Sequence, residues 1–281
     1  MIKKRVLSYL ILIIFCFMIW FPLWMMLTGS FMGNREITDY IGPAFSESNK
    51  KISWSFLPLY PTLRPFVELL LDSPNFFAMF WNSCKQVIPG LFGQLIIGVP
   101  AAWSFARYHF KGKNTIFLFY IILMIMPFQV TMVSNYLVLH KLHLMNTHWS
   151  LILPNVFSTF PVFIMTKFFE SIPQSLLEAA RIDGAGEGKV FWYIGIPLGA
   201  SGIISAFVLG FLEEWNAIEK PLTFLKDKSL WPLSLFLPEI AIEKLGVAMA
   251  ASLITLTPAL LIFLYGQTYL EQGIIASGIK E

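Results

Sequence analysis

The polar stretch Glu178-Ala-Ala-Arg-Ile-Asp-Gly-Ala-Gly-Glu-Gly-Lys-Val-Phe-Trp-Tyr-Ile-Gly-Ile-Pro197 interrupts a chain that is otherwise mostly apolar. One hydrophobic run ends immediately before it, at Leu177, and another begins immediately after it, at Leu198. Its glycines and its mix of acidic and basic residues are typical of a structured loop. A structured loop between two membrane-crossing segments predicts a surface that contacts another protein.

The composition predicts an all-α polytopic membrane protein. Of the 281 residues, 56% are hydrophobic and 13% are charged, whereas a soluble chain carries about 25% charge. Six apolar blocks can each cross a bilayer, which takes about 20 residues, and the fifth is the shortest. We predict a single domain over residues 1–281, with a loop at 170–198 and six transmembrane helices at residues 6–28, 83–106, 115–134, 149–169, 199–212 and 247–269.

The basic residues predict how the chain crosses the membrane. Lys3, Lys4 and Arg5 precede the first span, and Arg107, Lys111 and Lys113 lie between the second and third. The positive-inside rule makes both segments cytoplasmic. An even number of spans then places both termini and the 170–198 loop in the cytoplasm. The net charge of +3 is too small to suggest a nucleic-acid partner.

Neutral polar residues lie within the predicted spans, where they must face protein or water. No Asp, Glu, Lys or Arg sits in the middle of a predicted span, which argues against an ion-coupled secondary carrier. Neutral hydrogen-bonding groups suit an uncharged, hydroxyl-rich solute. The alternative is that they hold the helices together. The candidate residues for a solute path are Gln129, Asn135, Asn155, Ser158, Thr159 and Thr255.

Catalytic, metal and nucleotide sites are not indicated. The histidines at 140, 143 and 148 lack a nearby acidic or thiol ligand, so no zinc site is predicted. The stretch from Gly184 to Val190 resembles a phosphate-binding loop, but Asp183 replaces a required glycine and Val190 a required Ser or Thr. We predict a chain that is not an enzyme and that binds no cofactor itself.

The 170–198 loop is predicted to contain two short helices. Ser171 and Pro173 suit the start of the first, and Gly184 suits a left-handed residue at its end. The second is expected at about 189–193, running back towards the membrane until Pro197 stops it.

The outer face of this loop has two interpretations. The small residues Ala179, Ala180 and Ala185 would let another protein pack closely, and Glu178 and Asp183 offer charge to a basic partner. Alternatively, Glu178 only pairs with Arg181 or Lys189 within the loop, for about 0.2–0.5 kcal/mol.

Four segments of the chain match one known family: Phe169–Ala185, Phe191–Leu198, Trp215–Leu222 and the glycine-containing tail Gln272–Lys280. Together they resemble the permeases of binding-protein-dependent ABC importers, in particular the carbohydrate branch. The loop resembles their EAA loop, and the likeness covers nearly the whole chain. The chain is most similar to the shorter, six-span permease of the maltose type, although Ser201 stands where the family often has proline.

The resemblance implies a type I ABC permease fold in a bacterial or archaeal cytoplasmic membrane, where the chain contacts membrane lipid, and import of a sugar or oligosaccharide. It implies a second homologous permease, two copies of a cytoplasmic ATPase that bind ATP and magnesium, and an extracytoplasmic solute-binding protein. By position, the residues that couple to the ATPase are Glu178, Ala179, Ala180, Asp183, Gly184 and Ala185, and those near the binding protein are Trp215, Asn216 and Pro221. A different polar solute, or a self-contained carrier, remains the alternative.

Overall fold

The computed structural model describes residues 2–44, 53–237 and 244–278. Over these residues the chain is built from helices and connecting loops, with no strand. It divides into two compact units, which are described separately. The first contains residues 1–78 and 235–258, and the second contains residues 79–234 and 259–281. Two long helices, α4 (Pro74–Arg107) and α14 (Leu245–Gly278), run from one unit into the other.

The first unit holds the N-terminal span and the segment that follows it. Its helices are α1 (Ile2–Gly29), α2 (Asn34–Ile41), η1 (Gly42–Ala44) and α3 (Arg64–Leu71). From Ser8 onwards α1 is apolar, and it is unburied along the stretch long enough to cross a membrane. The indole of Trp24 donates a hydrogen bond to the Phe56 carbonyl oxygen at 2.9 Å, which ties the segment after α1 to the end of this helix.

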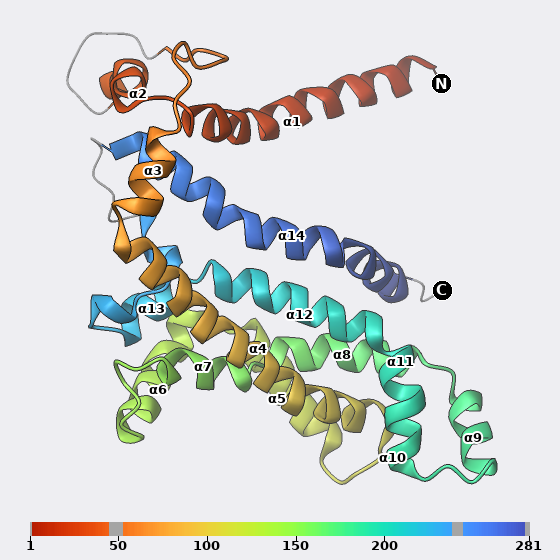
Figure 1. The fold of residues 1–281 in the computed structure, drawn as a ribbon. Helices are drawn as coiled ribbons and strands as arrows, with labels where there is room; N and C mark the ends of the chain where they lie inside the picture. The colour runs from red at the N-terminus through yellow and green to blue at the C-terminus, as the bar shows by residue number, and fades with distance from the viewer. Residues whose placement is uncertain (1, 45–52, 238–243, 279–281) are drawn as a thin grey trace. The chain divides into compact units, whose positions relative to one another are not determined.

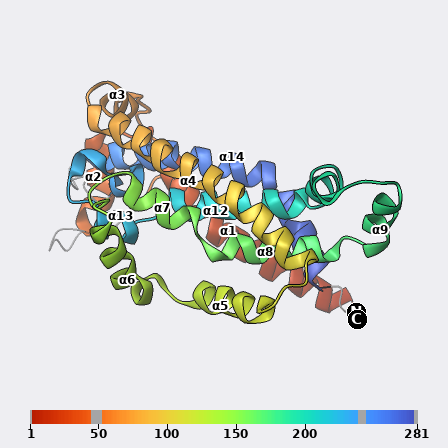
Figure 2. The same ribbon diagram turned by 90° about the horizontal axis from the view of Figure 1, so that it is seen from below.

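The second unit contains the remaining helices (Figure 1), except that the division between the units falls within the short turn η4 (Leu233–Leu235). They are α5 (Lys113–Ile125), α6 (Phe128–Lys141), α7 (Trp149–Val156), α8 (Thr159–Ser171), α9 (Gln174–Ile182), α10 (Glu187–Val190), the π-helical turn η2 (Phe191–Gly195), α11 (Ile196–Leu198), α12 (Ala200–Trp215), α13 (Glu219–Phe224) and η3 (Lys228–Leu230). Both views place α9 at one end of this unit and α6 and α13 at the other (Figure 2). The 170–198 loop therefore lies at the opposite end of this unit from α13, which contains Pro221, one of the residues expected near a binding protein.

Six membrane-crossing segments are consistent with the helices, although two of them are bent. Four helical stretches are long and apolar enough to cross alone: Ser8–Gly29, Pro74–Arg107, Trp149–Ser171 and Leu245–Glu271. The other two are pairs of helices, α5 with α6 and the helices of Glu187–Leu198 with α12. The pairs bend by 108° and 65°. The all-α prediction is confirmed, and the helices fit six spans if each bent pair is one span.

The predicted span over residues 115–134 contains a sharp bend, where α5 ends and α6 begins. Met126 is extended, with ψ at 123°, and Pro127 precedes α6. The ring of a proline clashes with a helical conformation of the residue before it. The apolar run continues through Pro127, so hydropathy alone could not detect the break.

A buried cluster of the second unit joins the spans to the 170–198 loop. Trp103 of α4 packs edge-on against Phe169 of α8 at 5.3 Å between ring centres, and lies 5.6 Å from Phe191 of η2. Leu177 of α9 and Val190 of α10 are fully buried in the same cluster. Burial of such side chains stabilises by roughly 1.5–3 kcal/mol each, so the loop is fixed to the ends of the spans.

Replacing Gly199 by alanine is expected to destabilise this cluster. A β-carbon there would overlap the Phe169 ring and lie 2.9 Å from the Gly195 carbonyl oxygen. Overpacking of this kind costs roughly 1–3 kcal/mol, so the unfolding temperature in detergent should fall. Gly188→Ala is the control, because a β-carbon at Gly188 meets nothing within 4 Å. Equal unfolding temperatures for the two variants would contradict the packing described here.

Candidate functional site

The first helix of the 170–198 loop, α9, starts at Gln174, three residues after α8 ends at Ser171. The Ser171 hydroxyl donates to the Phe168 carbonyl oxygen at 2.7 Å, so it completes the end of α8. Pro173, not Ser171, is the residue that precedes α9. The prediction that Ser171 caps this helix is therefore wrong, because its hydroxyl finds a nearer acceptor in the preceding turn.

One face of α9 is buried and the other is exposed. Leu177 is fully buried and Ala180 packs partly buried against the same cluster. On the other face, Ile182 is 85% exposed and Leu176 is 48% exposed. Of the predicted coupling residues, Glu178, Ala179, Asp183 and Gly184 are exposed, and Ala180 and Ala185 are half-buried. An exposed apolar side chain beside an acidic one is a surface suited to a protein partner.

The end of α9 is a tight left-handed turn at Gly184, as the sequence predicts. Its φ is +83°. Its amide donates to the Arg181 carbonyl oxygen at 3.0 Å, and the Ala185 amide donates to the Ala180 carbonyl oxygen at 3.0 Å. These bonds satisfy carbonyl groups that a helix end leaves open. The turn fixes where Asp183 and Ala185 stand relative to the rest of α9.

Gly184→Ala is expected to weaken this turn through the backbone alone. A β-carbon at Gly184 meets nothing within 4 Å, but alanine disfavours the left-handed conformation by roughly 1–2 kcal/mol. Amide hydrogen exchange over residues 174–185 should speed up accordingly. Gly186→Ala is the matched control, because Gly186 has a φ of −69° and equally open surroundings. Equal exchange in both variants would contradict a structural role for the turn.

The ion pair within the loop joins Arg181 to Glu187. Arg181 Nε lies 2.7 Å from Glu187 Oε1, and this hydrogen bond raises the pKa of Arg181. Glu178 accepts a hydrogen bond from Gln174 Nε2 at 3.2 Å. The exposed carboxylate of Glu178 thus lies beside the Gln174 amide, whereas the Arg181 guanidinium forms its ion pair with Glu187. The alternative in which Glu178 serves an ion pair with Arg181 is not the arrangement found in the described residues.

Arg107 connects the end of α4 to the start of this loop, and sequence patterns did not single it out for this role. Its guanidinium donates to the carbonyl oxygens of Phe169 and Ile172, the latter at 2.5 Å. A second nitrogen lies 3.4 Å from the Gln174 side-chain oxygen. The guanidinium also lies 5.8 Å from the centre of the Trp103 ring. A cation at a helix C-terminus stabilises it, so Arg107 fixes the end of α8 and the position of α9.

The returning segment runs through α10, η2 and α11 without a break at Pro197. The helix was predicted to stop at Pro197, and it ends one residue later, at Leu198. Pro197 itself lies in the first turn of α11, where a missing amide hydrogen costs little. The chain bends after Leu198, where Gly199 leads into α12. The predicted packing of this segment against the spans is found, with Val190 buried and Phe191 and Ile194 partly buried.

At the opposite end of the unit, two of the three residues expected near a binding protein are buried. Trp215 stacks on Phe211 at 5.3 Å, and Pro221 lies inside α13. Asn216 is exposed, and its side chain donates to the Leu212 carbonyl oxygen at 2.8 Å, at the end of α12. Trp215 and Pro221 therefore hold the segment after α12 in shape. The loop expected to reach the binding protein extends from about Trp215 to Lys244, and its residues 238–243 lie outside the described residues.

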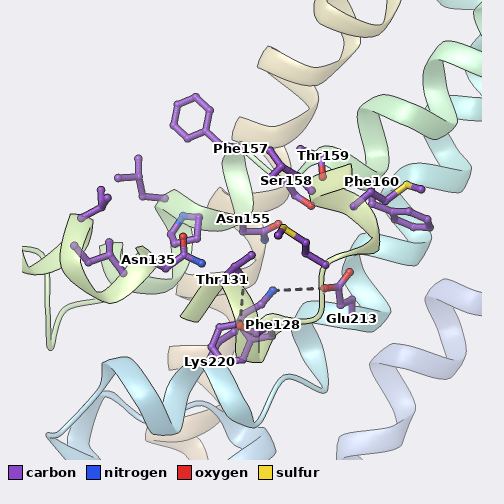
Figure 3. A pocket seen from close by; sticks show the side chains of 17 residues that line it. Phe128, Thr131, Asn135, Asn155, Phe157, Ser158, Thr159, Phe160, Glu213 and Lys220 are labelled. Carbon is purple, nitrogen blue, oxygen red and sulfur yellow. Dashed lines mark hydrogen bonds and ion pairs between the residues drawn. The ribbon is translucent and has the colours of Figure 1, made fainter. Parts of the chain in front are cut away.

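Four of the six solute-path candidates line one cavity of about 610 Å³ in the second unit: Asn135, Asn155, Ser158 and Thr159 (Figure 3). Gln129 instead donates to both oxygens of Glu219 at 2.9 Å. The Thr255 hydroxyl donates to the Ala251 carbonyl oxygen at 2.8 Å, within the other unit. Asn155 is buried and accepts hydrogen bonds from Gln94 at 3.2 Å, which matches the helix-holding alternative.

Comparison with known proteins agrees with this architecture. Residues 94–276 match the family model described as "Binding-protein-dependent transport system inner membrane component". The chain is 27% identical to the arabinooligosaccharides transport system permease protein AraQ of Halalkalibacterium halodurans, over 98% of this chain and 97% of that protein. It is 31% identical to the probable ABC transporter permease protein PH1036 of Pyrococcus horikoshii, over 81% and 85% of the two chains.

A solved structure shares the fold. It is the crystal structure of a bacterial ABC transporter involved in the import of the acidic polysaccharide alginate. The TM-score is 0.81 at 20% sequence identity, and the match covers 95% of this chain and 96% of that one. The described helices thus follow a fold that a membrane transport protein is known to adopt.

Proposed function

The chain belongs to the family of binding-protein-dependent transport system inner membrane components, and from that premise we propose that it forms half of the pore of an importer for a neutral saccharide. It is a multi-pass permease subunit of an ABC transporter. In the proposed complex, a second homologous permease completes the pore. A solute-binding protein delivers the saccharide from outside, and two ATPase subunits bind the cytoplasmic face.

The observation that carries this proposal is the two-sided packing of α9. Its inner face is buried against the core that joins the spans, and its outer face leaves Glu178, Ile182 and Gly184 exposed. A partner that moves α9 therefore moves a packed cluster with it, because packed interiors transmit displacement. We propose that the ATPase binds this outer face and that Glu178, Ala179, Ala180, Asp183, Gly184 and Ala185 form the contact.

A saccharide is the proposed solute for two reasons. The relative AraQ carries arabinooligosaccharides in its name. The cavity of the second unit is also lined by neutral polar and aromatic side chains, beside aliphatic ones and one pair of charged residues. Charges do occur at the end of α12, which extends beyond the predicted boundary at residue 212, but Glu214 there is paired with Lys220 at 2.5 Å. Because Glu214 is held in this ion pair, it differs from the unpaired coupling charge on which a secondary carrier depends.

Solute uptake by the native host tests this proposal. The gene is deleted, restored on a plasmid, and uptake of labelled arabino-oligosaccharides and maltodextrins is compared with uptake of oligouronates, glycerol 3-phosphate and arginine. We expect the deletion to remove uptake of one neutral saccharide and the plasmid to restore it. Loss of arginine or anion uptake, with saccharide uptake unchanged, would contradict the proposed solute class.

A further inference from the structure

The cavity of the second unit lies where two of the membrane-crossing segments are interrupted. It is lined from the bend between α5 and α6, from the break between α7 and α8, and from the end of α12 with α13. Interrupted helices leave backbone groups open, which at membrane depth is tolerated only inside protein or beside water. Transport proteins build solute sites from such discontinuous helices. The volume of about 610 Å³ is within the range of small-molecule sites.

The lining combines neutral polar groups and aromatic rings with aliphatic side chains. Asn135, Ser158 and Thr159 are half-buried, and within the part of the chain that the structure describes their side chains make no hydrogen bond. Their donors and acceptors are therefore available to a solute. Phe157, at the break between α7 and α8, is 61% exposed and borders the same space (Figure 3). An aromatic face can cover the apolar face of a sugar ring, while amides and hydroxyls bind its polar edge.

A group of charges closes one side of the cavity. Lys220 Nζ lies 2.5 Å from Glu214 Oε1 and 3.5 Å from Glu213 Oε1. The Glu214 side chain is 11% exposed, whereas that of Glu213 is 58% exposed. Burial alone would lower the pKa of Lys220, but attraction by the Glu214 and Glu213 carboxylates outweighs burial, so the pKa of Lys220 is raised. Lys220 therefore compensates the buried carboxylate, and the second carboxylate keeps open acceptor positions beside the cavity.

We propose that this cavity is a contact site on this chain for a neutral, hydroxyl-rich solute in transit. Asn135, Ser158 and Thr159 exchange hydrogen bonds with its hydroxyl groups, and Phe157 covers an apolar ring face. The Glu213 carboxylate accepts hydrogen bonds from two hydroxyls and disfavours anionic analogues. Two carboxylates against one ammonium leave an excess negative charge at this wall, which repels uronates and phosphates.

The inference rests on the proposed function, and cysteine protection tests it in the complete complex. Ser158→Cys is made in a background with Cys16→Ser and Cys84→Ser, the other two cysteines of the chain. Membrane vesicles with the whole transporter and its binding protein are treated with N-ethylmaleimide. The solute is arabino-oligosaccharide or maltodextrin, whichever wild-type cells take up. Leu118→Cys on α5 is the control, because it is 55% exposed but does not line the cavity.

We expect the cysteine at 158 to react readily and to be protected at least severalfold by the saccharide, but not by an oligouronate. Glu213→Gln keeps the shape of the side chain and should leave the reaction without sugar unchanged. The sugar concentration for half-protection should rise about tenfold, because a charge-assisted hydrogen bond is lost. Equal protection at 118, no protection at 158, or no reaction at 158 would overturn the contact site. Each of these leaves the proposed function standing wherever wild-type saccharide uptake is intact.

Discussion

Glu178→Lys is expected to abolish saccharide uptake while the protein still inserts into the membrane. Glu178 is exposed on α9, and its only described hydrogen bond is the one from Gln174. The substitution therefore leaves the buried cluster around Leu177 intact. Uptake is measured in the deletion strain at equal amounts of membrane-inserted protein.

The size of this effect follows from the charge reversal at a protein interface. Removing one partner of a close interfacial charge pair costs roughly 2–5 kcal/mol, and reversal of the charge adds repulsion. A loss of about 3 kcal/mol lowers an association constant by roughly two orders of magnitude. At cellular concentrations of an ATPase subunit, that would remove most of the assembled transporter.

The matched control is Glu170→Lys, which makes the same charge change at the end of α8. Glu170 forms an exposed pair with Lys167 at 2.9 Å, and such surface pairs contribute little. We expect near-normal uptake for this variant. Normal uptake in Glu178→Lys, or equal loss in both variants, would contradict a specific contact at Glu178.

Arg107→Ala has the second largest expected effect, and it acts through α9 without changing the loop itself. The guanidinium holds the carbonyl oxygens of Phe169 and Ile172 at the end of α8. Leaving such groups without a donor costs roughly 1–3 kcal/mol each. We expect uptake to fall at least tenfold, and amide exchange over residues 174–185 to rise, with assembly largely retained.

Two further variants separate position from charge. Lys111→Ala removes a positive charge from the same connection, but Lys111 is exposed and should tolerate the change. Arg107→Lys keeps the charge but lacks the second guanidinium nitrogen, which reaches Gln174 while Nη2 serves both carbonyl oxygens, so we expect intermediate exchange. If Lys111→Ala lowers uptake as much as Arg107→Ala, net charge and not the contact with α8 is responsible.

The sequence allowed the spans and the turn of the loop to be predicted. Long apolar blocks identify membrane-crossing segments because the bilayer fixes their length. Gly184 identified the left-handed turn because few other residues adopt that conformation cheaply. The returning helix was predicted to end at Pro197 and ends one residue later, at Leu198, because proline is tolerated in the first turn of a helix.

Sequence patterns could not predict contacts between residues that lie far apart in the chain. Arg107 was read as a marker of orientation, and only the fold brings it to carbonyl groups more than 60 residues away. The solute-path candidates were chosen as polar residues in spans. Asn135, Ser158 and Thr159 do share a cavity, whereas Gln129 is engaged by Glu219. Helical position alone does not tell which polar side chains face one another.

Co-purification of the tagged chain from native membranes, with wild type beside Glu178→Lys, tests the central claim most directly. The claim is that the exposed face of α9 docks an ATPase subunit. We predict that wild type brings down an ATPase and a second permease, and that the Glu178→Lys variant keeps the permease but loses the ATPase. Wild-type protein that comes down alone, or a variant that retains the ATPase fully, would contradict it.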